Sequence, residues 1–240
     1  SGLVGSEMCI RDRRRNAKGF DKIVESGIFE EIWLMDLSGV RLNGIEFATR
    51  EEILQATKDF KGVVRAFGYL DLDGAAEQPD MLKEMGFVGL KPYKPHFPYS
   101  DERYFPIYER AQALRMPVLF HTGLVAKGPA WGIEKSKRSF GPINMQPQNL
   151  AAIAEAFPDL KIMQGHLGWP YIDQTEQNLY YYKNITCDVS GFRRCVGDLP
   201  SFFDKKCNDD SDSLRFFNQK TLFATDQFYG CLLYTSDAAD

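Results

Sequence analysis

The amino-acid sequence predicts an α/β fold in which a parallel sheet closes into a (β/α)8 TIM barrel. Short apolar segments recur along the chain, helix-sized polar segments separate them, and polar residues follow nearly every apolar segment. Strands that are apolar on both faces and alternate with helices are typical of parallel sheets. An open doubly wound sheet would gather the polar residues at one switch point, so their spread over many strand ends favours a barrel.

Seven strands and six intervening helices are expected. The strands are predicted at residues 31–38, 63–71, 87–93, 117–123, 160–168, 185–190 and 221–227. The helices are predicted at residues 49–60, 78–85, 104–114, 148–157, 171–182 and, with a polar interruption, 199–217. Thr49 is a suitable N-cap for the first helix, and Gly86 is a suitable end for the second.

Three of the expected strands end in residues that can carry chemistry. The segment PVLFHTG delivers His121, LKIMQGHLG delivers His166, and TLFATDQ delivers Asp226. The carboxyl ends of strands are where α/β folds hold their catalytic groups. Each residue also has a structural interpretation, because either histidine could be a satisfied scaffold residue and Asp226 could cap a helix.

Composition and charge narrow the class of protein. The chain has 33 acidic and 29 basic residues and a pI near 5.5, so it lacks the broad basic surface of a nucleic-acid-binding protein. At 44% hydrophobic residues, with no apolar run long enough to span a membrane, it is expected to be a soluble, cytoplasmic globular protein. The three cysteines away from the chain ends, at positions 187, 195 and 207, have no metal-ligand spacing and fit reduced thiols.

The two chain ends have an unusual relationship. Residues 7–12 and 231–236 can be back-translated into DNA strings that are nearly reverse complements, as a transposase-based sequencing adaptor would leave. We therefore expect residues 1–13 and 231–240 to be adaptor-like artefacts. Residues 14–230 would then be one natural domain cut at both ends.

Five segments carry a resemblance to a known family. In order and spacing, GFVGLKPY, PVLFHTG, AFPDLKIMQGHLGWP, NITCDVSG and LFATDQ resemble the amidohydrolase-related (amidohydrolase 2) branch of the metal-dependent hydrolase superfamily. The resemblance covers residues 30–229 and implies a distorted (β/α)8 barrel. The first strand of that family carries His-X-His or Glu-X-His, whereas the histidines here are His96, His121 and His166. The resemblance therefore implies a partial barrel that lacks the first strand and the last helix.

The resemblance also implies roles for the strand-end residues. His121 and Asp226 would be metal ligands, with Zn²⁺ as the expected ion and the first-strand ligands missing. A metal-activated water would attack the substrate, Asp226 would double as the base, and His166 would be the catalytic group that polarises the carbonyl or moves protons.

Substrate contacts are expected from Lys91, His96 and Trp169. Lys91 could instead be a solvated lysine or a carbamylated metal bridge, His96 a loop contact, and Trp169 a rim residue. Asp188 and Ser190 end another strand, where they belong either to the site or to loop packing. The long segment 124–146 contains several lysines and an arginine, which suggests a small substrate that bears a carboxylate.

The expected function is a metal-dependent hydrolase acting on a small amide, lactone or ester. The first alternative is a metal-dependent non-oxidative decarboxylase of an aromatic or enoic acid, which would use the same residues. The second is a barrel without metal that acts in binding or structure. We expect the fragment itself to hold metal weakly and to lack activity, because two ligands bind Zn²⁺ loosely. The sequence leaves open whether the protein is a homo-oligomer.

Overall fold

The computed structural model describes residues 22–38, 48–123, 141–190, 219–222 and 224. The predicted helix at 199–217, Asp226 and the two adaptor-like ends lie outside these residues. The described strands are β1 (Ile32–Met35), β2 (Val64–Leu70), β3 (Gly89–Pro92), β4 (Val118–Phe120), β5 (Ile162–Gln164), β6 (Ile185–Asp188) and β7 (Thr221–Leu222). The described α-helices are α2 (Arg50–Asp59), α3 (Gln78–Met85), α4 (Phe105–Ala113), α5 (Gln148–Ala156) and α6 (Ile172–Tyr181), with 3₁₀ turns η1 (Glu102–Tyr104), η3 (Gly141–Met145) and η4 (Gly165–Gly168).

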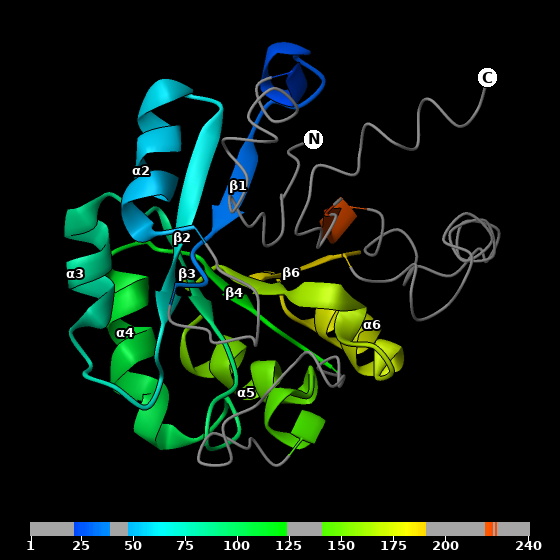
Figure 1. Ribbon diagram of the computed structural model, residues 1–240. Coiled ribbons are helices and arrows are strands. Elements are labelled where there is room, and N and C mark those ends of the chain that lie inside the picture. Colours follow the sequence, from blue (N-terminus) through cyan, green and yellow to red (C-terminus); the bar gives the residue numbers. More distant parts are fainter. Residues whose placement is uncertain (1–21, 39–47, 124–140, 191–218, 223, 225–240) are drawn as a thin grey trace, which may run out of the picture.

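The strands form one parallel sheet in sequential order, β1-β2-β3-β4-β5-β6-β7. Each strand pairs with the next along the chain, from Ile32 beside Val64 to Asp188 beside Leu222. A doubly wound sheet reverses its strand order at a switch point, whereas a (β/α)8 barrel does not. Figure 1 shows the curled sheet with the helices around its outside. The described sheet is therefore part of a TIM barrel, as the sequence predicts.

Two apolar clusters lie on opposite faces of the sheet. The larger one fills the layer between the strands and the helices and includes Leu90, Val118 and Ile162. The smaller one lies on the inner face and consists of Met35, Phe67, Leu119, Met163 and Ala224, with Trp33 and Leu222 packed against it. Because side chains alternate along a strand, His121, two positions after Leu119, faces the same interior one layer nearer the carboxyl ends. The inner cluster is thus the floor beneath the strand-end residues.

A glycine allows the floor to close. Phe67 stacks on Trp33 with ring centroids 4.9 Å apart. A Cβ atom on Gly89 would overlap the ring of Phe67. Gly89, two residues before Lys91, is therefore the residue of β3 that lets this ring lie across the interior.

Local signals agree with several predicted boundaries. Thr49 caps α2 in a capping box, in which its hydroxyl accepts from the Glu52 amide and the Glu52 carboxylate accepts from the Thr49 amide. Helix α3 spans residues 78–85, as predicted, and ends at Gly86 in the left-handed conformation. Side chains thus satisfy backbone groups at the start of α2, and the Gly86 amide satisfies carbonyl groups at the end of α3.

Strand ends are where the predicted boundaries were wrong. The predicted strand at 117–123 pairs only over Val118–Phe120, and the one at 160–168 pairs only over Ile162–Gln164. His121 follows the end of β4, and His166 lies in the turn η4. At these positions the backbone leaves the hydrogen-bonded sheet, so both histidines lie just past the carboxyl ends of their strands.

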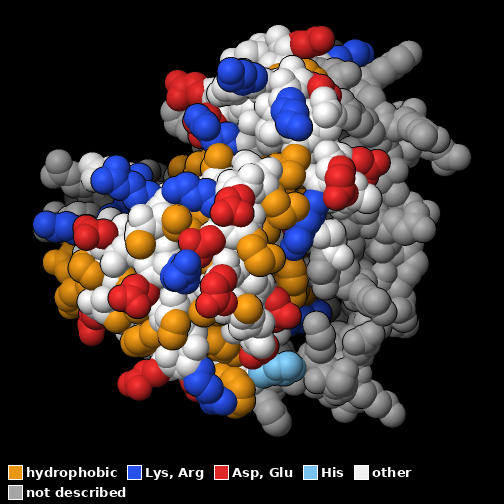
Figure 2. Space-filling view, turned by 90° about the vertical axis from the view of Figure 1, so that its left-hand side faces the viewer, with side chains coloured by type: hydrophobic (Ala, Val, Ile, Leu, Met, Phe, Trp, Pro, Cys, Tyr) orange, Lys and Arg blue, Asp and Glu red, His pale blue; other side chains and the backbone are white. Residues whose placement is uncertain are grey.

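The helical face carries a mixed charge. Figure 2 shows acidic and basic side chains interspersed on one side of the molecule, with hydrophobic side chains between them. Exposed apolar side chains of α3 include Met81 and Met85, which are 55% and 42% exposed. None of the helices in the described part of the chain is long and apolar enough to cross a membrane.

Candidate functional site at the carboxyl ends of the strands

His121 follows β4 and is buried, with 8% of its surface exposed. Its backbone carbonyl accepts a hydrogen bond of 3.0 Å from the phenol of the fully buried Tyr99. The edge of its ring contacts Tyr93, with ring centroids 5.2 Å apart. The buried Tyr99 therefore holds the backbone of His121, and the half-buried Tyr93 packs against its imidazole.

His166 reaches the same point through a sharp turn. After β5, His166 and Leu167 adopt left-handed backbone angles, with φ of 63° and 51°. Such angles cost non-glycine residues roughly 1–2 kcal/mol each, so neighbouring contacts must hold them. The amide of His166 donates to Asp188 at 3.0 Å, and the hydroxyl of Thr122 donates to the carbonyl of Gly165 at 2.6 Å. The turn directs the imidazole of His166 toward the neighbouring strand end.

The two imidazoles are in direct contact. His166 Nε2 lies 2.9 Å from His121 Nδ1, and the ring centroids are 4.4 Å apart. One nitrogen must donate and the other must accept at this distance. The structure therefore brings together the two histidines that the sequence places at separate strand ends.

Asp188 and Ser190 support His166 from the end of β6. Ser190 Oγ lies 2.7 Å from His166 Nδ1 and donates a very short hydrogen bond to Asp188 Oδ1. The same carboxylate oxygen accepts from the Ser190 amide at 2.9 Å, in addition to the His166 amide. Both residues are 1% exposed. A continuous hydrogen-bonded chain thus runs from Asp188 through Ser190 and His166 to His121.

Lys91 lies on the inner face at the end of β3 and is 1% exposed. Its register partner in β2 is Tyr69. Burial raises the pKa of Tyr69 to about 12, and the negative charges of Asp71, Asp73 and Asp36 add to this rise. Tyr69 therefore keeps its phenolic proton at neutral pH. Because Lys91 is buried, the interpretation of it as a solvated loop lysine is wrong. Burial of a lysine requires compensating interactions.

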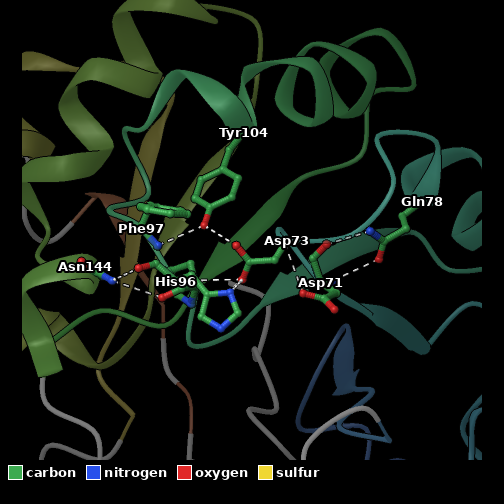
Figure 3. A network of polar contacts seen from close by, with 8 residues as sticks. Asp71, Asp73, Gln78, His96, Phe97, Tyr104 and Asn144 are labelled. Atoms are coloured by element: carbon green, nitrogen blue, oxygen red, sulfur yellow. Dashed lines mark hydrogen bonds and ion pairs between the residues drawn. The ribbon is translucent and has the colours of Figure 1, made fainter. Parts of the chain in front are cut away.

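His96 lies in a different network, on the loop after β3 (Figure 3). Its Nδ1 lies 3.0 Å from a carboxylate oxygen of Asp73, and its amide donates to the same oxygen at 3.2 Å. The Tyr104 phenol donates to the other oxygen of Asp73 at 2.7 Å, and Asn144 donates to the His96 carbonyl at 2.9 Å. The His96 side chain is 43% exposed. These contacts join the loops that follow β2 and β3.

Trp169 follows η4 and is half-buried. Its carbonyl lies against Gly123, where an added Cβ atom would overlap it. Gly123 also has a φ of 83°, which only glycine adopts without strain. The chain segments after β4 and β5 thus meet backbone to backbone beside the two histidines.

The sequence missed one part of this arrangement. Asp188 and Ser190 are recognisable as strand-end polar residues, but sequence alone left them as either site or loop residues. Their spacing of two residues places both on one side of the chain end, and this was the available signal. The left-handed turn at His166, which brings its Nδ1 to Ser190, has no clear signature in the sequence.

The described residues do not form a complete metal site. Among them, no group of three or more His, Cys, Asp or Glu side chains is arranged to hold a metal ion. Neutral imidazoles are suitable donors for Zn²⁺, Mn²⁺ or Fe²⁺, so His121 fits as one ligand. The second predicted ligand, Asp226, lies outside the described residues.

The sequential order of the parallel strands and the helices around them define a TIM-barrel protein (Figure 1). Residues 40–229 match the family model described as Amidohydrolase. The chain belongs to this amidohydrolase family. No curated protein matches it significantly.

Solved structures share the fold at low sequence identity. An uncharacterized TIM-barrel protein from Bordetella bronchiseptica is 16% identical, with a TM-score of 0.63 over 91% of this chain and 73% of that one. A probable 2-pyrone-4,6-dicarboxylic acid hydrolase from Acinetobacter baumannii, with citric acid bound, is 14% identical, with a TM-score of 0.55 over 94% and 82%. A 5-carboxyvanillate decarboxylase from Novosphingobium aromaticivorans, with manganese and a nitrobenzoic acid bound, is 16% identical, with a TM-score of 0.54 over 94% and 75%. The solved structures that share this fold thus include one named as a hydrolase and one named as a decarboxylase.

Proposed function

We propose that the protein is a metal-dependent hydrolase of a small amide, lactone or ester. The observation that carries this proposal is the contact between His121 and His166 above the floor of an amidohydrolase-family barrel, with Ser190 and Asp188 behind it. His121 and Asp226 are proposed as metal ligands. His166 and Asp226 are proposed as the catalytic groups.

A divalent metal, when bound, would polarise the substrate carbonyl and lower the pKa of water at the site. The chain's own contribution is proton transfer and positioning. His166 Nε2 lies 2.9 Å from His121 Nδ1, and His166 is proposed to take up a proton at Nε2 and to pass it on during the reaction. Ser190 and Asp188 fix the opposite side of the His166 ring.

Lys91 is proposed to bind an anionic group of the substrate. It is a buried cation on the inner face, in the register position beside the protonated Tyr69. The ligands of two structural neighbours, citric acid and a nitrobenzoic acid, bear carboxylates and support this choice. His96 and Trp169 remain proposed as rim contacts of the substrate, with His96 already engaged by Asp73.

Decarboxylation of an aromatic acid is the second candidate. The similarity to 5-carboxyvanillate decarboxylases favours it. Protonation of a carbon needs a proton donor at the same place as protonation of a leaving group, so His166 would serve either reaction. The same residues therefore support both candidates.

A product assay separates the candidates. The purified full-length protein, with Zn²⁺ or Mn²⁺ added, is offered 2-pyrone-4,6-dicarboxylate, 5-carboxyvanillate and simple amides and esters, and CO₂ release is followed in parallel with ring or amide opening. Metal-dependent ring, ester or amide opening without CO₂ supports the hydrolase. Stoichiometric CO₂ identifies the decarboxylase. Turnover that survives chelation, or tight binding without turnover, would contradict both and favour a binding barrel.

A further inference from the structure

We propose that Asp188 and Ser190 are positioning residues that fix His166 in the tautomer with its hydrogen on Nδ1, and that this places the lone pair of His121 on Nε2. The inference rests on the proposed function only where it identifies Nε2 as the atom through which His121 would hold a metal. The donor and acceptor capacities of the atoms in contact determine where each hydrogen lies.

The first step fixes the hydroxyl of Ser190. Asp188 Oδ1 accepts from two backbone amides, those of His166 and Ser190. It is therefore an acceptor, and the hydrogen bond with Ser190 Oγ uses the hydroxyl hydrogen of Ser190. With that hydrogen committed, Ser190 Oγ presents a lone pair to its other neighbour.

The second step fixes His166. Its Nδ1 faces Ser190 Oγ at 2.7 Å and the Ser190 backbone carbonyl at 3.3 Å. The carbonyl can only accept, and the hydroxyl hydrogen is already used. Two independent acceptors thus require a hydrogen on His166 Nδ1.

The third step fixes His121. When both rings are neutral, His166 Nε2 carries the lone pair and accepts from His121 Nδ1–H over 2.9 Å. His121 Nε2 then carries the lone pair that a metal requires.

Asp188 also holds the backbone on which this depends. The His166 amide that donates to Asp188 belongs to a residue with φ of 63°. Loss of the carboxylate would release both the left-handed turn and the hydroxyl of Ser190. One side chain therefore sets the place of the His166 ring and, through Ser190, its tautomer.

Nitrogen NMR of the histidine rings in the metal-free protein tests the inference directly. The chain has three histidines, so the spectrum is simple to assign. We expect His166 to show a protonated Nδ1 and an unprotonated Nε2, and His121 to show the same pattern. Ser190→Ala is expected to raise the minor tautomer of His166 roughly tenfold, because a hydrogen bond is lost. Ser190→Thr retains the hydroxyl and is expected to restore the wild-type spectrum.

Ser100→Ala is the matched control. Ser100 Oγ donates to Asn149 at 3.2 Å and does not belong to the chain of contacts at His166, so the histidine spectrum is expected to stay unchanged. In turnover assays Ser190→Ala is expected to lower kcat about tenfold to a hundredfold and to leave KM unchanged. A purely structural role for Ser190 would lower the melting temperature without moving the tautomer signal.

The outcomes distinguish this inference from the proposed function. A wild-type His166 with its hydrogen on Nε2, or a Ser190→Ala spectrum identical to wild type, would overturn the positioning role even in an active enzyme. The expected tautomers in a protein without turnover would support the positioning role and count against the proposed function. If a variant fails to fold, the wild-type spectrum alone still shows whether His166 carries its hydrogen on Nδ1.

Discussion

At the carboxyl ends of β1 and β2, the carboxylates of Asp36 and Asp73 are occupied by donors from the scaffold, whereas at the ends of β4 to β6 imidazoles contact each other. Asp36 accepts from Arg50 at 2.7 Å and from the Ser38 and Tyr69 amides. His121 and His166 instead direct ring nitrogens at one another. Both regions consist of polar residues that follow buried strands. Position at a strand end therefore does not distinguish a loop contact from a reactive group, but the partner of the side chain does.

Removal of a carboxylate is expected to change the free energy of unfolding far more in one region than in the other, and this is the largest expected difference between them. Asp188 is 1% exposed and accepts from two backbone amides and a hydroxyl. Asp188→Ala is expected to lower the free energy of unfolding by about 3 to 5 kcal/mol, because buried donors lose their acceptor. Asp73, whose side chain is 22% exposed, is the matched site, and Asp73→Ala is expected to cost only about 1 kcal/mol. Urea unfolding of both variants gives the comparison.

Equal losses of unfolding free energy for the two variants would contradict the expected difference between the two regions. They would show that the Asp188 carboxylate is no more essential than one that joins loops at the rim. A melting curve without a cooperative transition for Asp188→Ala alone would agree with the expected order.

The second expected effect concerns the close approach beside the histidines. Gly123 and Gly62 both have positive φ, of 83° and 90°, but only Gly123 would bring a Cβ atom against another backbone. Gly123→Ala is expected to destabilise by about 2 kcal/mol more than Gly62→Ala, which has open space around it. Chemical unfolding of the pair isolates the steric part. Equal effects would show that the segment at Trp169 can move away from Gly123.

A smaller effect is expected at His96. Its contact with Asp73 is partly exposed, so His96→Gln is expected to lower the free energy of unfolding by at most about 1 kcal/mol. A substrate contact at the rim would raise KM and leave kcat unchanged. Steady-state kinetics of the variant therefore test the proposed substrate role of His96. A large loss of kcat would place His96 with the reactive histidines and remove the contrast between the two regions.

An alkaline response is also expected from Tyr69. Its pKa of about 12 in the folded protein lies above the ordinary value of 10.0, so the unfolded chain loses this proton first. Its contribution to stability is complete below about pH 10 and is lost as the pH rises through about 12. Tyr69→Phe should therefore reduce the fall in unfolding free energy between pH 9 and pH 11. Tyr181→Phe, at a side chain that is 71% exposed, should leave that slope unchanged.

The fold could be predicted from the sequence because every level of the pattern agrees. Apolar strands, capped helices such as the one at Thr49, and polar strand ends all indicate one parallel barrel. The proximity of His121 and His166 could be expected in general terms, because adjacent strands end at the same mouth. The tautomer-setting contacts of Ser190 could not be foreseen, since they depend on two left-handed residues that tertiary contacts hold in place.

The pattern was also ambiguous for lone polar residues at strand ends. Lys91 and His96 lie five residues apart and both follow the same apolar segment, yet Lys91 is buried and His96 is 43% exposed. The difference arises from the direction of β3, which turns Lys91 inward, and from Asp73, which holds His96 at the loop. The sequence gives the residue types but does not show which tertiary contacts each side chain makes.

Bound metal and turnover, measured on the same preparations of the full-length wild type, His121→Ala and His166→Asn, test the central claim most directly. His121→Ala is expected to lose bound metal and turnover together. His166→Asn is expected to retain the metal while kcat falls about 10²- to 10⁴-fold, because the proton-transfer group is gone. A His166→Asn variant with wild-type kcat would contradict the assignment of proton transfer to His166.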